Sequence, residues 1–223
     1  MICSEKGRSY TLKEASCAIL GVPEFPKTPE DLPLNLYLPP EILGNLATSI
    51  LDTNLDGRER SQRVYWSSFR NTPKATAVDI GTQSHTGYKS TAIRTFDVLL
   101  GRTALAAYHT HWVEHPYQKQ FSERDIANNA HSVELIDILG TSSGISALVA
   151  TKQSCRKNFQ GSAIMLLRSM SRERQLAKLN PVCMYHWRFG VTMEKFGLGY
   201  YFKPLSNIAE DSFSRGITVS LNH

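Results

Sequence analysis

The chain has 223 residues, of which 41% are hydrophobic and 9% aromatic, so it can bury a core and is not a disordered chain. Its 25 Lys and Arg residues exceed its 20 Asp and Glu residues and give a net charge of +5. No stretch approaches the roughly 20 apolar residues of a membrane span, and charges interrupt the N-terminal segment where a signal peptide is apolar. We therefore expect a soluble, cytoplasmic protein whose four cysteines, with no CxxC pair, are reduced.

The N-terminal segment is rich in proline. Six of the ten prolines fall between Pro23 and Pro40, and proline disfavours both helices and central strands. We expect residues 1–38 to form an extension, with a short helix over residues 12–20 followed by an extended connector that lies on the main domain.

The main domain is predicted over residues 39–152. Pro40 suits a first helical turn, and apolar residues at helical spacing predict a helix over residues 41–52, ended by turn chemistry at residues 54–57. Short β-like runs follow at 63–69, 75–80 and 104–109. A polar passage at 81–90 precedes residues 93–100, which suit either a helix or a strand.

The second half of the chain predicts further helices and strands. Ser122 has the features of a helix N-cap, with the helix running to about residue 133. Residues 135–139 and 145–151 predict a hairpin. In the C-terminal part, residues 153–223, we expect a basic helix and strands at 182–189 and 199–203 that pack on the core. This order indicates a mixed α/β or α+β domain with a mostly antiparallel sheet.

The pattern with the clearest chemistry joins His109, His111 and Asp125. Residues i and i+2 of a strand point to the same face, so both imidazoles can reach one ion. Asp125 lies one turn into the following helix, on the side of Ser122. Two histidines and one carboxylate leave a fourth tetrahedral position for water, as in catalytic zinc sites.

These residues resemble the JAMM (MPN+, JAB-type) zinc metalloproteases. That family has an upstream glutamate, an H-[ST]-H-P segment, a short loop and S-x-x-D. The segment His109-Thr110-His111 is similar to the first motif, and the segment from Phe121 to Ile126 is similar to the family's F-S-x-x-D-[IL] form. The resemblance covers about residues 40–152 and implies the JAB/MPN-like, cytidine-deaminase-like sheet flanked by helices.

The resemblance also implies a role for each residue. His109, His111 and Asp125 would hold Zn²⁺, Glu59 would act as general acid and base, and Ser122 would stabilise the oxyanion. The substrate would be a protein, including ubiquitin-like conjugates, cleaved at a peptide or isopeptide bond. Asp79 is the rival for the role of Glu59.

Three features depart from the family pattern and leave alternatives open. Trp112 replaces the usual proline and is a candidate for lining a substrate groove; the loop before Ser122 is longer; and Ser61-Gln62-Arg63 stands where glycines are common. The alternative is a catalytically inactive MPN-like module that binds a protein partner. His115 and His131 are spare imidazoles, expected on a loop and a helix surface.

A third hypothesis concerns the segment from Lys152 to Lys178, which has seven basic residues and one acid. Such a segment suits nucleic acid or an acidic partner, although a solvated helix face is the simpler interpretation. No nucleic-acid motif accompanies it, so this hypothesis ranks last. The sequence does not indicate an oligomeric state.

Overall fold

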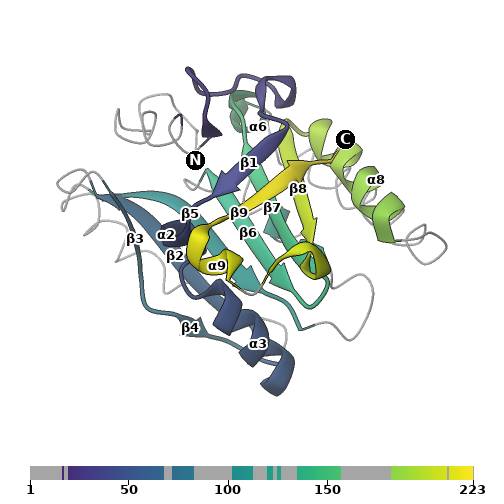
Figure 1. Ribbon diagram of the computed structural model, residues 1–223. Helices are drawn as coiled ribbons and strands as arrows, with labels where there is room; N and C mark the ends of the chain where they lie inside the picture. Colours follow the sequence, from purple (N-terminus) through teal and green to yellow (C-terminus); the bar gives the residue numbers. More distant parts are fainter. Residues whose placement is uncertain are drawn as a thin grey trace.

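One sheet forms the body of the molecule (Figure 1). The computed structural model describes residues 20–67, 72–82, 102–112, 120–122, 125–126, 135–156, 182–209 and 211–222, together with Cys17. Within them the sheet has nine strands in the order β1-β9-β8-β7-β6-β5-β2-β3, and β4 pairs separately with β2. The strands are β1 (Asn35–Leu38), β2 (Arg60–Ser67), β3 (Thr72–Ala75), β4 (Asp79–Ile80), β5 (Arg102–Thr110), β6 (Ile136–Thr141), β7 (Gly144–Ala150), β8 (Leu198–Pro204) and β9 (Ile217–Leu221).

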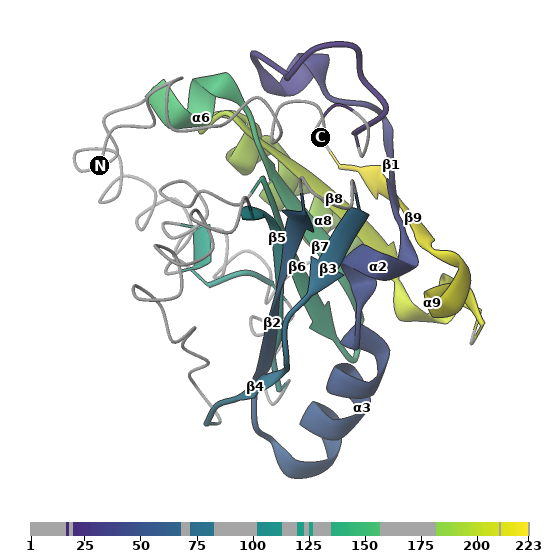
Figure 2. The ribbon, with the colours of Figure 1, turned by 90° about the vertical axis from the view of Figure 1, so that its left-hand side faces the viewer.

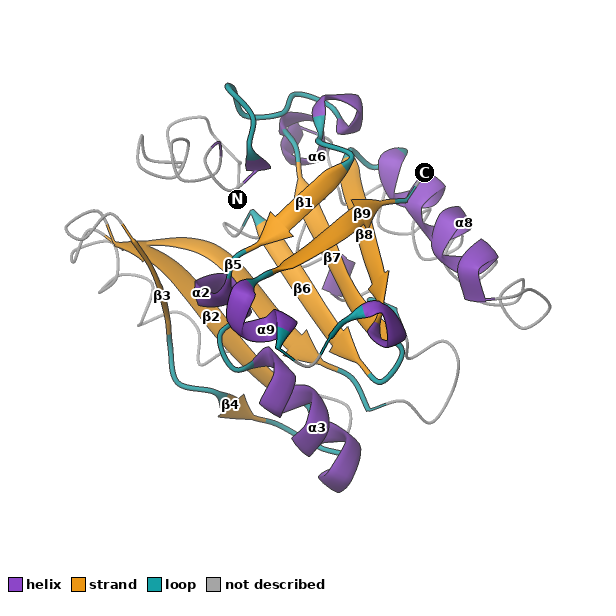
Figure 3. Cartoon of the chain, viewed as in Figure 1, coloured by secondary structure: helices purple, strands orange, loops and turns teal. Residues whose placement is uncertain are grey.

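The described helices lie around the sheet (Figure 3). Every described strand pair is antiparallel except β5 and β6, which run parallel. The predicted mixed α+β domain with a mostly antiparallel sheet is therefore confirmed. The helical segments are α2 (Pro40–Leu43), α3 (Leu46–Asp56), α6 (Lys152–Arg156), α8 (Val182–Glu194) and α9 (Ser212–Arg215), with 3-10 turns η1 (Pro29–Asp31) and η3 (Leu205–Asn207).

Alternate residues of the strands enter two separate cores, one on each face of the sheet. On β6, for example, Ile138 joins the first core and Leu139 the second. The first core also takes in α2 and α3, which lie with α9 on one side of the sheet in Figure 2. The second core takes in Phe189 and Met193 of α8, which packs against β8.

The single helix predicted over residues 41–52 is wrong, because the chain forms two helices there. Gly44 adopts a positive φ of 53°, and a Cβ at that position would lie 2.5 Å from Oε1 of Gln62. That oxygen accepts a hydrogen bond from the Asn45 N–H at 3.2 Å. The second helix, α3, then continues to Asp56 and ends at Gly57 in the left-handed conformation, one turn beyond the predicted end.

Two strand predictions also need correction. The run predicted over 75–80 is divided between β3 and β4, which pair with different parts of β2. The strand predicted over 182–189 is wrong, because these residues belong to α8. The buried residues His186, Phe189 and Met193 follow helical spacing, which the high aromatic content of the segment concealed. The predicted strands at 104–109, 135–139, 145–151 and 199–203 are confirmed with small shifts of their ends.

The sheet crosses both domain boundaries drawn from the sequence, at residues 38 and 152. Leu36 of β1 pairs with Val219 of β9, and Ala147 of β7 pairs with Tyr201 of β8. The helix predicted at 12–20, the segments 83–90 and 93–100 and the basic stretch 157–178 lie outside the described residues, apart from Cys17 and Leu20. No described helix has both the length and the apolar character to cross a membrane.

Candidate metal centre

The end of strand β5 and the residue after it place both candidate ligand histidines on one face of the sheet. His109 lies near the end of β5 and His111 directly after it, and the two ring centroids are 4.9 Å apart. Both residues are buried. Between them, Thr110 points to the opposite face, where its hydroxyl lies 2.6 Å from that of Thr53 in α3. The alternation predicted for this segment is therefore confirmed.

Asp125 reaches the histidines through a capped helical turn. The Asp125 N–H donates to Oγ of Ser122 at 3.2 Å, and the Ser122 N–H donates to Oδ2 of Asp125 at 2.7 Å. The reciprocal hydrogen bonds of this capping box confirm Ser122 as the predicted N-cap. They also fix the direction of the carboxylate, whose same oxygen faces the imidazoles. Residues 127–133 of the predicted helix lie outside the described part of the chain.

Buried contacts hold the segment that carries Ser122. The Tyr200 hydroxyl donates to Oε1 of Gln120 at 2.5 Å, and the amide nitrogen of Gln120 contacts Nδ1 of His186. Phe121 places its ring against that of His109, with centroids 5.7 Å apart. The segment before the capped turn is therefore tied both to the second core and to the candidate site.

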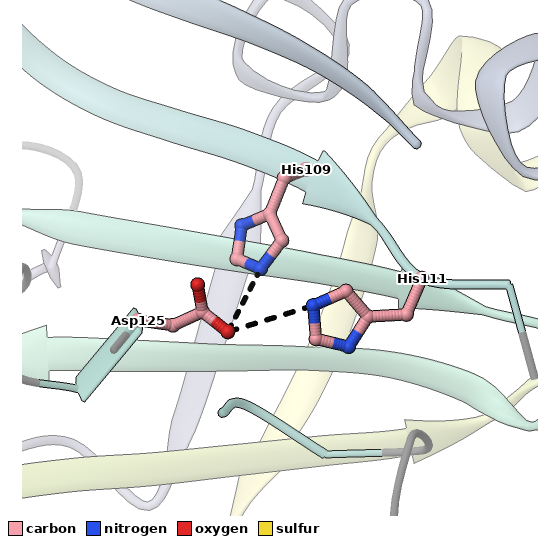
Figure 4. Close-up of side chains that lie close together, drawn as sticks. All are labelled: His109, His111 and Asp125. Atoms are coloured by element: carbon pink, nitrogen blue, oxygen red, sulfur yellow. Dashed lines mark ion pairs between the residues drawn. The ribbon is translucent and has the colours of Figure 1, made fainter. Parts of the chain in front are cut away.

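Figure 4 shows the three side chains converging. Oδ2 of Asp125 lies 3.5 Å from Nε2 of His109 and 3.5 Å from Nε2 of His111. One potential ligand atom from each residue lies within 4.8 Å of the other two. Nε2 of His109 is buried and makes no hydrogen bond. A buried acceptor or donor without a hydrogen bond is costly, and a cation between these atoms would remove that cost.

The carboxylates control the charge of His109. Burial lowers the pKa of its imidazole, but the charges of Asp125 and Asp137 outweigh burial and hold that pKa well above the ordinary 6.5. Burial also raises the pKa of Asp125, yet the two imidazoles outweigh it and hold that pKa well below 3.8. Each group therefore stabilises the charged form of the other.

The donor set of these residues fits a divalent metal ion. Two imidazole nitrogens and one carboxylate oxygen are ligands that zinc and related metals accept, and three protein ligands leave a further position open. His109, His111 and Asp125 are therefore assigned as the candidate ligands.

Glu59 lies beside this centre, and its Oε1 is 4.0 Å from Nε2 of His111. It precedes β2, where its N–H donates to Thr82 O and its carbonyl accepts from the Gly81 N–H. Among the described residues, no ion pair joins the rival Asp79 to a histidine; Asp79 lies in β4 opposite Ser61. The geometry thus favours Glu59 for a role next to the ligands.

Asp137 is the site residue that the sequence interpretation missed. Its Oδ1 lies 3.5 Å from Nδ1 of His109, on the ring edge opposite Asp125. The available signal was an acid within an otherwise apolar strand, between Ile136 and Ile138. A carboxylate in such a strand costs free energy unless another polar group faces it.

Three further residues were singled out from the sequence near the candidate ligands. Trp112 follows His111 and is half-buried. His115 and His131 lie outside the described residues. Comparison of the sequence with family models finds no match, and comparison with curated proteins finds no relative.

Proposed function

We propose that this protein is a zinc-dependent hydrolase of JAMM type that cleaves peptide or isopeptide bonds on an MPN/JAB-like domain. The observation that carries the proposal is the convergence of His109, His111 and Asp125 with Glu59 next to them. A strand with two histidines, a capped turn with an aspartate and an upstream glutamate occupy the order that the JAMM resemblance implies.

Each residue has a chemical task in this proposal. A zinc ion held by His109, His111 and Asp125 supplies Lewis acidity and lowers the pKa of a bound water to about 7. Glu59 accepts a proton from the attacking water and returns it to the leaving amine. The hydroxyl of Ser122 already accepts the Asp125 N–H, so its own proton is available to donate to the oxyanion.

The substrates in this proposal are proteins, including conjugates of ubiquitin-like modifiers. Trp112, next to His111, is placed where it can line the groove that receives the extended peptide. These assignments depend on the JAMM resemblance, because peptide and isopeptide cleavage are the reactions of that family.

The decisive experiment compares Glu59→Gln with Asp79→Asn in zinc-loaded protein. The probe is a ubiquitin-like protein joined through its C-terminus to a lysine side chain of a fluorescent peptide. Glu59→Gln should keep about one zinc per chain and lose at least about 100-fold in rate, the usual contribution of a general acid and base. Asp79→Asn should retain the wild-type rate, since Asp79 lies in β4 and pairs with no histidine in the described chain. Full activity in Glu59→Gln would refute the assigned role.

A non-catalytic, partner-binding MPN-like protein is the second candidate. Ser61 and Arg63 favour it, because these buried polar residues of β2 stand where the family commonly has glycines. Metal analysis separates the two candidates. A folded protein that takes up no zinc would support the binding module, and one zinc per chain, lost in His109→Ala, would support the enzyme.

A further inference from the structure

We propose that Asp137 is a positioning residue for His109: it accepts the Nδ1–H of that imidazole and so directs Nε2 toward the metal. The inference rests on the proposed metal centre, and it extends that centre to a strand that contributes no ligand.

The first argument is geometric. His109 lies between two carboxylates, with Nε2 3.5 Å from Asp125 and Nδ1 3.5 Å from Asp137. The side chains of His109 and Asp137 are only 8% and 14% exposed, so bulk water is largely excluded from the contact. The two ring nitrogens therefore have distinct surroundings, and the ring cannot rotate by half a turn without exchanging them.

The second argument comes from the strand register. Strands β5 and β6 are parallel, and Asp137 pairs with Ala107, two residues before His109 on the same face. The Asp137 carboxylate therefore approaches His109 diagonally, from the position directly opposite Ala107.

The third argument is chemical. A neutral imidazole that binds a metal through Nε2 carries its only proton on Nδ1. In metal sites that second ring nitrogen regularly donates to a carboxylate or carbonyl, which fixes the tautomer and makes the ligand more basic. Asp137 is the carboxylate that the fold supplies at this nitrogen.

Asp137 also lies in an unfavourable place for a purely structural residue. Its neighbours Ile136 and Ile138 are fully buried in the first core, and Leu139 in the second. A carboxylate in such a strand costs free energy unless a charged or hydrogen-bonding group faces it. His109, with Nδ1 3.5 Å from Oδ1, is one such group.

The test is a zinc titration against a competing chelator dye, using wild type, Asp137→Ala, Asp137→Asn and the control Asp211→Asn. Asp137→Ala should weaken zinc binding by about 10- to 100-fold, the usual effect of removing such a partner. Asp137→Asn retains an oxygen acceptor of the same size and should recover part of this loss. Asp211 lies before α9 and pairs with the exposed Arg215, so its variant should bind zinc as wild type does.

Two spectroscopic readouts separate positioning from a general effect on folding. The absorption of the cobalt-substituted protein should change in Asp137→Ala, because the ligand field at His109 changes. A ring N–H proton of His109, visible by NMR in the zinc-loaded wild type, should disappear through faster exchange in that variant. Circular dichroism checks that each variant is folded. If Asp137→Ala does not fold, Asp137→Asn is compared with the wild type instead.

The outcomes distinguish this inference from the proposed function. If wild type binds no zinc, the metal centre itself is overturned. If wild type binds zinc while folded Asp137→Ala or Asp137→Asn shows unchanged affinity and an unchanged cobalt spectrum, the positioning role alone is overturned.

Discussion

At the scale of single residues, the candidate centre is a set of side chains that fix one another's charge. The Asp125 oxygen that faces both histidines also accepts the N–H of Ser122. One backbone hydrogen bond therefore sets the direction of a carboxylate that interacts with two imidazoles. The same mutual stabilisation holds the pKa of His109 well above 6.5.

Zinc binding is expected to release a proton. The pKa of His109 is held well above 6.5 by Asp125 and Asp137 despite burial, so at neutral pH the ring carries a proton that zinc must displace. Calorimetric titrations in buffers of different ionisation enthalpy should show roughly one proton released per zinc from this group. Heats that do not depend on the buffer at neutral pH would contradict the prediction.

The same pKa values predict how the stability of chelated protein depends on pH. A raised pKa in His109 stabilises the fold fully below about 6.5, and this contribution is lost as pH rises through the folded pKa. A lowered pKa in Asp125 stabilises the fold above about 3.8, and this contribution is lost as pH falls through its folded pKa. The melting temperature in excess chelator should therefore fall as pH rises above 6.5, and zinc should suppress that fall. A melting temperature that rises over this range would contradict the assignment.

At the scale of elements, the candidate ligands depend on the contacts that β5 makes on the face opposite the site. Thr110 turns away from the site, accepts the Arg60 N–H at 2.9 Å and lies 2.6 Å from the Thr53 hydroxyl. Two residues earlier, the Tyr108 hydroxyl lies 3.0 Å from Ser49 Oγ of α3. The end of β5 is thus bonded to both β2 and α3, which explains why a hydroxyl residue between the histidines is useful.

Replacing Thr110 by valine is expected to destabilise the protein by about 1–3 kcal/mol, since it leaves buried groups of Arg60 and Thr53 without this partner. Thr110→Ser retains the hydroxyl and is the matched control. Urea unfolding measures the free energy, and zinc titration should show weaker binding in the valine variant alone. Equal stability of the valine and serine variants would show that the hydroxyl is not needed.

The local motifs of this sequence predicted which three side chains come together. By contrast, several of the helices and strands predicted from the sequence have other bounds or another type in the structure. The H-T-H segment and the S-x-x-D cap depend on short-range geometry, which a sequence displays directly. The break between helices α2 and α3 at Gly44 could not be predicted, because it depends on a contact with Gln62 of strand β2. Asp137 was missed for a similar reason, since the parallel register of β5 and β6 brings it to His109.

At the scale of the whole molecule, distant parts of the chain complete the sheet. Strand β1 pairs with β9, and β9 pairs with β8, so residues near both ends of the described chain share one edge. Asn222, directly after β9, lies against α8: a Cβ on Gly190 would be 1.7 Å from its carbonyl oxygen. Helix α8 therefore contacts the chain that follows the sheet at a position where only glycine fits.

Replacing Gly190 by alanine tests this contact. In an isolated helix the change would add about 1 kcal/mol of stability through helix propensity. Here the backbone oxygen of Asn222 occupies the place of the new methyl group, so we expect a net loss of more than about 1 kcal/mol. Urea unfolding measures it, and removing residues 222–223 from the alanine variant should relieve the conflict. Greater stability of the alanine variant in the full chain would disprove the close contact.

The parallel pairing of β5 and β6 has a consequence for the order of events during folding. His109 and His111 are neighbours even in an unfolded chain, so they can capture a metal ion early, with two ligands only. Asp125 lies within the connection that must cross the sheet before β6 can pair with β5, and crossover pairings of this kind form slowly. At the proposed centre, a nascent chain would therefore hold zinc loosely and exchange it freely, and the finished crossover would be needed to retain the ion.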